Sequence, residues 1–98
     1  MREKVIEKYM RDQVKTMGGK AYKFVSPGNN GVPDRLCILP GGRIFFVETK
    51  APGKKPTGRQ LLELQKLSML GCTVYPCVDS KEAVDSMLLH ERRRYVQP

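Results

Sequence analysis

The sequence predicts an α/β fold in which a mixed central sheet is flanked by helices, in the order helix, three strands, helix, strand, helix. Three features support this order: helical spacing of apolar residues at the amino end, two short apolar runs joined by a glycine-rich turn, and a later leucine-rich segment. The 98 residues contain no internal repeat, low-complexity tract or long linker. We therefore expect one domain over residues 1–98.

Start and stop signals bound the elements in the first half of the chain. Gly18-Gly19 ends the first helix, because glycine is favoured where a helix terminates. The two apolar runs on either side of Pro40-Gly41-Gly42 should pair antiparallel as a hairpin. The continuous apolarity of the second run is typical of a central strand. The predicted elements are a helix over 2–17, strands over 21–25, 35–39 and 44–47, a helix over 58–70, a strand over 72–78 and a last helix to about residue 91.

The second half carries its own signals. Thr57 is a good N-cap for the leucine-rich helix, and Gly71 follows its end. Pro76 favours an edge position for the last strand, because proline cannot donate a ladder hydrogen bond. Asp79 and Glu82 have the spacing of a capping box for the last helix. The connection through the leucine-rich helix should be a right-handed crossover between parallel strands, which makes the sheet mixed.

Two carboxylates and one amine are expected to converge at the open end of the hairpin. If the turn centres on Gly41, cross-strand partners have numbers that sum to about 82, so Asp34 lies opposite Glu48, roughly 5 Å away at the backbone. Because side chains alternate along a strand, Glu48 and Lys50 share one face. Thr49 is expected to point to the other face and to contribute only its backbone carbonyl.

This set of oxygens predicts a divalent metal site. Adjacent carboxylates repel and raise each other's pKa unless a cation lies between them. Hard oxygen ligands with space for water suit Mg²⁺ or Mn²⁺ rather than Zn²⁺. Such a metal polarises a phosphate oxygen and lowers the pKa of bound water, while Lys50 can orient that water or stabilise the developing charge. The predicted chemistry is phosphodiester hydrolysis.

Asp34 followed by Glu48-x-Lys50 resembles the PD-(D/E)XK nuclease signature, and the surrounding motifs resemble its VRR-NUC branch, in particular a small stand-alone, virus-type member. The resemblance covers about residues 3–80 and implies a restriction-endonuclease-like αβββαβ core. It also implies that Asp34, Glu48 and the Thr49 carbonyl are metal ligands, that Lys50 is the catalytic amine and that Gln60 is a polar residue of the site. The motifs are Ser26-Pro27-Gly28, Gly31-Val32-Pro33-Asp34-Arg35, Gly41-Gly42-Arg43, Glu48-Thr49-Lys50-Ala51, Gln60 and Leu70-Gly71-Cys72.

Two assignments stay open. The family usually adds a carboxylate from the first helix, where Glu3 and Glu7 lie on the same side. Glu7 is the preferred candidate because it is one turn further from the fraying terminus, whereas Glu3 also suits a helix N-terminus for purely structural reasons. Thr57-x-x-Gln60 is itself a capping box, so Gln60 can serve the helix start, the site or both.

The charge of the chain favours a polyanionic partner, and the predicted site makes that partner DNA. Eighteen Lys and Arg against ten Asp and Glu give a formal net charge of +8. The basic segment 51–59 leaves directly from the predicted site and is expected to bind backbone phosphates. The run 92–94 is equally compatible with DNA and with a helix C-terminus. The candidate DNA-binding residues are Lys54, Lys55 and Arg59, with Arg35 and Arg43 as secondary candidates.

No apolar stretch approaches the roughly 20 residues of a membrane span, and the amino terminus lacks the apolar region of a signal peptide. The protein is therefore expected to be soluble and intracellular, without a membrane partner. Its three cysteines, Cys37, Cys72 and Cys77, have no metal-ligand spacing and are expected to be buried reduced thiols.

Three functional hypotheses follow from the predicted site. In the first, a homodimer cleaves four-way (Holliday) DNA junctions, because two symmetric sites suit a symmetric junction and small members of the family include such dimers. In the second, the nuclease acts on flaps, nicks or duplex ends, beside a helicase or another replication or repair partner. In the third, the fold binds DNA without turnover. Four apolar residues can either form the dimer interface or cover the sheet: Met69, Val84, Met87 and Leu88.

Overall fold

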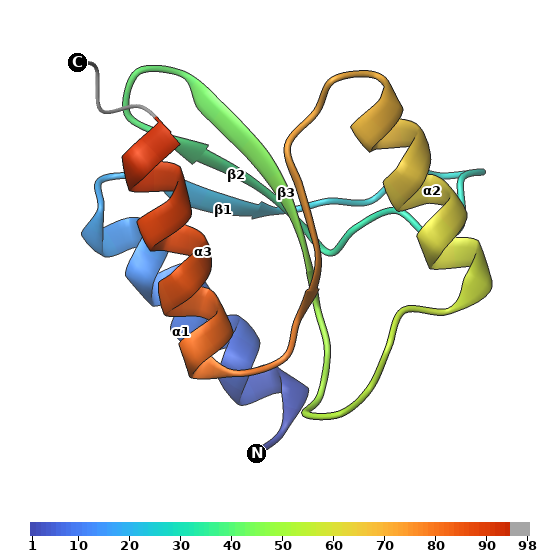
Figure 1. Ribbon diagram of the computed structural model, residues 1–98, viewed down its shortest axis with the longest axis horizontal. Helices are drawn as coiled ribbons and strands as arrows, with labels where there is room; N and C mark the ends of the chain where they lie inside the picture. The colour runs from blue at the N-terminus through green and yellow to red at the C-terminus, as the bar shows by residue number, and fades with distance from the viewer. Residues whose placement is uncertain (95–98) are drawn as a thin grey trace.

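Within residues 1–94, which the computed structural model describes, four strands form one sheet with helices on both of its faces (Figure 1). Helices α1 and α3 lie side by side on one face, and α2 lies on the other. The elements are α1 (Glu3–Thr16), β1 (Lys20–Lys23), β2 (Arg35–Leu39), β3 (Arg43–Thr49), α2 (Gly58–Met69), β4 (Val74–Val78) and α3 (Lys81–Arg94). This order is the predicted one.

The sheet has the order β1-β2-β3-β4 and is mixed. Strands β1 and β2, and β2 and β3, pair antiparallel, whereas β3 and β4 pair parallel. The hairpin register is the predicted one, with Leu39 opposite Arg43 and Arg35 opposite Val47. Strand β3 lies between two neighbours, as its continuous apolarity predicts, and β4 with Pro76 lies at the edge.

The main core lies between the sheet and the α1/α3 layer. The apolar stripe of α1 is fully buried there, as its helical spacing predicts. The open choice for the later apolar residues is thereby decided: Val84, Met87 and Leu88 cover the sheet, whereas Met69 is 88% exposed at the end of α2. The buried residues of this core are Ile6, Met10, Val14, Cys37, Leu39, Phe45, Val47, Val78, Val84, Met87 and Leu88.

Two predicted boundaries are wrong for identifiable reasons. Strand β4 begins at Val74 rather than at residue 72, because the backbone N–H of Cys72 closes the end of α2 by donating to the Leu67 carbonyl at 3.0 Å. The capping box predicted at Asp79 is also wrong. The Ser80 hydroxyl caps α3 by accepting a hydrogen bond from the Ala83 N–H at 2.9 Å, so the helix begins one residue later.

The strand predicted over 21–25 is also displaced and spans Lys20–Lys23. Pairing continues past its end, however, because the N–H of Phe24 donates to the Asp34 carbonyl at 2.8 Å. The backbone at Asp34 is thus held beside β1 just before β2 begins.

The expectation of buried cysteines holds for one of the three: Cys37 is buried, whereas Cys72 and Cys77 are only partly buried. None of the described helices combines the length and the apolar character needed to cross a membrane.

Candidate active site and metal centre

Asp34 and Glu48 lie opposite each other at the open end of the β2–β3 hairpin. Because Arg35 pairs with Val47, the same register places Asp34 opposite Glu48 at the next position of the hairpin. A register shift between Val47 and Thr49 interrupts the ladder to β4 at this point. Such irregularities redirect side chains and are frequent beside active sites. The hairpin register predicted from the sequence therefore brings the two carboxylates together.

Thr49 contacts Asp34 with its side chain, which the sequence-based alternation did not predict. Oδ2 of Asp34 accepts one hydrogen bond from the Thr49 backbone N–H at 3.0 Å and a second from the Thr49 hydroxyl at 2.7 Å. The expectation that Thr49 contributes only its carbonyl is wrong. The physical reason is that the Asp34 carboxylate accepts from the Thr49 backbone N–H as well as from its hydroxyl, so the contact does not require the Thr49 side chain to share the face of Glu48.

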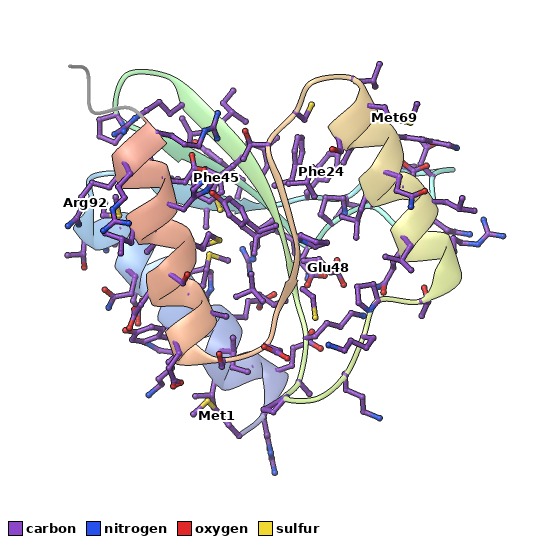
Figure 2. All side chains as sticks on the ribbon, viewed as in Figure 1. Met1, Phe24, Phe45, Glu48, Met69 and Arg92 are labelled. Atoms are coloured by element: carbon purple, nitrogen blue, oxygen red, sulfur yellow. The ribbon has the colours of Figure 1, made fainter. Side chains whose placement is uncertain are left out.

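Glu48 is 2% exposed, although it is a carboxylate. Its Oε2 atom accepts a hydrogen bond from Gln60 Nε2 at 3.0 Å and lies 3.3 Å from Lys50 Nζ. Its Oε1 atom is buried and has no hydrogen-bond partner within residues 1–94. Burial, and secondarily the charge of Asp34, raise the pKa of the Glu48 carboxyl to about 7, against the opposing effects of Lys50 and of the Asp34 backbone N–H. Figure 2 shows Glu48 on the side of β3 that faces α2, away from Phe45.

Gln60 joins α2 to the sheet and fulfils both roles that the sequence left open. Its Oε1 atom accepts from the Thr57 backbone N–H at 2.9 Å, and the Thr57 hydroxyl accepts from the Gln60 N–H at 3.2 Å. These two bonds form the predicted capping box. The other end of the same carboxamide donates to Glu48. The helix cap therefore fixes the side chain that contacts the buried carboxylate.

The carboxylates of α1 do not join this pair. Glu7 Oε1 accepts instead from an Arg35 guanidinium nitrogen at 3.2 Å, and Glu3 is exposed in the first turn. In the described part of the chain, no three Asp, Glu, His or Cys side chains lie close enough to share a metal ion. The ion pair with Arg35 is the physical reason that Glu7 is held at the neighbouring strand.

The pair nevertheless offers the oxygen ligands that a hard divalent cation requires. A buried carboxylate oxygen without a donor is costly, and a cation is one way to satisfy it. Asp34, Glu48 and the Thr49 carbonyl can supply the protein ligands, with water at the remaining positions as Mg²⁺ prefers. The residues present fit such an ion. Lys50, whose side chain is 15% exposed, lies beside the pair as the predicted amine.

The predicted DNA-binding residues fall into two groups. Lys54 and Lys55 are exposed in the segment between β3 and α2, which begins with Lys50. Arg59 is exposed in the first turn of α2. The Arg35 side chain, by contrast, is only 12% exposed and is bonded to Glu7 and to the Ala21 carbonyl.

Arg43 lies at the opposite end of β3 from Glu48, where its Nε donates to the Pro40 carbonyl at 2.9 Å. The basic segment therefore begins directly after Lys50, whereas Arg43 lies away from the site. A pocket of about 290 Å³ beside Arg59 is also lined by Asn30 and Lys66, which sequence reasoning did not select.

Comparison with known proteins identifies the family. No family model matches the chain. Over 71 residues it is 59% identical to a protein of Acyrthosiphon pisum secondary endosymbiont phage 1 named "Putative nuclease p44", and the match covers 72% of this chain and 76% of the phage protein. A solved structure titled "VRR_NUC domain" matches with a TM-score of 0.84 at 36% identity, over 90% of this chain and 95% of that one. The chain belongs to the VRR_NUC family.

This VRR_NUC chain is accordingly a nuclease, and both the resemblance noted in its motifs and the predicted mixed α/β core are confirmed. At the carboxylate pair, the contact that sequence reasoning missed is that of the Thr49 side chain. Its signal was present in the sequence, because a hydroxyl between Glu48 and Lys50 is a potential donor for a carboxylate, but alternation considers only which side chains share a face and did not indicate this contact.

Proposed function

We propose that this VRR_NUC nuclease is a metal-dependent endodeoxyribonuclease that hydrolyses DNA phosphodiester bonds with Mg²⁺, for which Mn²⁺ can substitute. The observation that carries the proposal is Oε1 of Glu48, a buried carboxylate oxygen without a donor in the described residues, opposite a second carboxylate. When bound by Asp34, Glu48 and the Thr49 carbonyl, the cation would polarise a phosphate oxygen and lower the pKa of a bound water.

Each side chain of the site has its own proposed role in the reaction. Lys50 lies 3.3 Å from Glu48, at the border between the buried carboxylate and solvent, where an amine can orient the attacking water or stabilise charge on the phosphate. Gln60 holds Glu48 in place through the cap of α2. We expect Asp34 and Glu48 to bind the cation, Lys50 to act on the substrate and Gln60 to position Glu48.

DNA is the proposed substrate because a positively charged segment leads away from the site. Lys54, Lys55 and Arg59 follow Lys50 within nine residues and are exposed, so we expect them to contact backbone phosphates adjacent to the scissile one. The formal charge of +8 supports a polyanion of some length rather than a single phosphate ester. None of these contacts reads base sequence, which is consistent with recognition of DNA structure.

A four-way junction is the proposed DNA structure, and a homodimer is the proposed active form. Two copies related by a two-fold axis present two equivalent sites to a substrate with matching symmetry. Exposed apolar residues on α2 and at its C-cap support self-association: Leu62 is 61%, Met69 88% and Leu70 81% exposed. Exposed apolar residues that form one continuous patch are typical of an interaction surface.

The deciding experiment compares wild type with Asp34→Ala on labelled four-way junction, flap, linear duplex and single-stranded DNA, with Mg²⁺, Mn²⁺ or EDTA. Paired incisions in the junction that require metal and Asp34 are the expected result. Preference for flaps or ends would replace the junction hypothesis with the flap, nick or duplex-end hypothesis. DNA binding without cleavage of any substrate would contradict the proposed activity.

A further inference from the structure

We propose that Thr49 is a positioning residue, whose hydroxyl holds Oδ2 of Asp34 and so leaves Oδ1 as the oxygen that binds the divalent cation. This inference rests on the metal-dependent function proposed above and deepens it. It gives the Thr49 side chain a role separate from that of its backbone carbonyl.

Two hydrogen bonds from Thr49 hold one oxygen of the Asp34 carboxylate in place. Two donors of one residue, the N–H at 3.0 Å and the hydroxyl at 2.7 Å, converge on the same carboxylate oxygen. Thr49 is fully buried and paired with Val78, and the next N–H, that of Lys50, donates to the Val78 carbonyl. Its hydroxyl is therefore fixed by the sheet rather than by solvent, and its branched Cβ further restricts rotation.

Glu48 shows the same division of labour between its two oxygens. Gln60 Nε2 and Lys50 Nζ both lie at Oε2, whereas Oε1 has no hydrogen-bond partner among residues 1–94. In Asp34, likewise, the N–H and the hydroxyl of Thr49 both donate to Oδ2. Each carboxylate thus has one oxygen held by protein donors and the other available to a cation. Such outer contacts orient metal ligands and commonly change metal affinity by about 10- to 100-fold when removed.

The hydroxyl can be tested separately from the rest of the residue. Thr49→Val keeps the shape, the branched Cβ and the backbone N–H and carbonyl, but removes the hydroxyl donor. Thr49→Ser keeps the hydroxyl and removes a methyl group. A contribution through the hydroxyl therefore predicts that serine restores the function that valine loses, whereas a contribution through packing predicts the reverse.

The first readout is Mn²⁺ binding to the protein without DNA, measured by the EPR signal of free Mn²⁺ and by calorimetry. We expect Thr49→Val to weaken binding by roughly tenfold and Thr49→Ser to remain close to wild type. Val84→Ala, a core substitution in α3 on the other side of the sheet, serves as a control for general destabilisation and should bind as wild type does. Equal affinity of Thr49→Val and wild type would overturn the inference.

The same experiment separates this inference from the proposed function. If wild type and Asp34→Ala bind Mn²⁺ equally weakly, the metal site itself is refuted. If wild type binds, Asp34→Ala does not, and Thr49→Val binds normally, only the role of Thr49 is refuted.

A second measurement does not depend on whether the valine variant folds. Anomalous diffraction from Mn²⁺-soaked crystals of the wild-type protein should show Oδ1 of Asp34 at the metal and Oδ2 still bonded to Thr49. Ligation through Oδ2 with loss of the Thr49 contact would overturn the inference.

Discussion

Gln60 donates a hydrogen bond from Nε2 to Glu48 Oε2 at 3.0 Å, while Oε1 of the same carboxamide accepts from the Thr57 N–H at 2.9 Å. One side chain thus closes the cap of α2 and contacts the buried carboxylate on β3. Because the cap fixes the carboxamide, the distance between α2 and the sheet is linked to the position of Glu48. Gln60 therefore caps α2 and contacts Glu48 in a single side-chain conformation.

Substitutions at Thr57 and Gln60 should separate these two roles. Thr57→Ala removes the capping hydroxyl but keeps the Gln60 side chain, so it should lower the free energy of unfolding by about 1 kcal/mol with little effect on cleavage. Gln60→Ala removes both the return bond to Thr57 and the donor to Glu48. We expect a similar loss of stability together with roughly a tenfold slower single-turnover cleavage.

Thermal unfolding in EDTA measures the loss of stability, and cleavage at saturating metal concentration measures the loss of rate independently. Equal cleavage rates for the two variants would show that Gln60 serves only the helix.

Lys50→Ala should abolish cleavage while DNA binding stays nearly intact. The variant removes the amine 3.3 Å from Glu48 but only one of 18 Lys and Arg residues. Lys15→Ala, on α1 across the sheet, is the matched control for the lost charge and should cleave normally. Binding is measured by fluorescence anisotropy with EDTA and turnover with Mg²⁺. Retained turnover in Lys50→Ala would contradict the proposed mechanism.

The pairing of the two carboxylates was predictable because it depends only on local information. A short turn at Gly41 fixes the hairpin register, and the register fixes which residues lie opposite each other. The capping box at Thr57 and Gln60 was predictable for the same reason, since its two partners are three residues apart. Sequence spacing alone could not show that the other end of Gln60 reaches Glu48, because α2 is placed against the sheet by tertiary packing.

The errors have tertiary causes as well. Alternation along β3 could not show that the Asp34 carboxylate accepts from both the N–H and the hydroxyl of Thr49, because that contact depends on how the chain before β2 lies beside β3. The pairing of Arg35 with Glu7 joins β2 to α1, and sequence spacing could not show that Glu7 would contact Arg35 rather than the carboxylate pair.

Arg94 provides a parallel case at the other end of the chain. It contacts Glu91 at 3.0 Å and the Thr73 hydroxyl at 2.6 Å, and Glu91 is fully buried and also bonded to Tyr75. At least this residue of the 92–94 run is engaged within the fold. The run of arginines predicted an interaction, but the sequence could not show that the partners of Arg94 are Glu91 and Thr73.

Lys54 and Lys55 should carry much of the salt dependence of DNA binding. Changing both to Ala should weaken binding and reduce the slope of log K against log salt by about two, because each phosphate contact contributes roughly one unit. Lys4→Ala with Lys15→Ala removes the same charge from α1 and controls for the general field of the protein. Titrations between low and moderate salt give both slopes. If the slope stays unchanged in the Lys54/Lys55 variant, the segment does not contact DNA phosphates.

The pKa of Glu48 predicts an unusual pH dependence of stability without metal. Burial raises this pKa to about 7 from the ordinary value of 4.5, so the folded protein holds the proton more tightly than the unfolded chain. The stabilising contribution of the protonated carboxyl is therefore complete below about pH 4.5 and is lost as the pH rises to about 7. Its size is at most on the order of 3 kcal/mol.

Glu48→Gln isolates this contribution, because the amide keeps the shape of the protonated carboxyl and does not titrate. In EDTA, the melting temperature of wild type should fall relative to that of Glu48→Gln between pH 5 and pH 8, since other groups titrate in both proteins. Mg²⁺ should raise the wild-type melting temperature more at pH 8 than at pH 5.5, because cation and proton compete for the same carboxylate. Parallel pH profiles of the two proteins in EDTA would show that Glu48 is ionised at neutral pH without a metal, and the buried carboxylate would then need a different explanation.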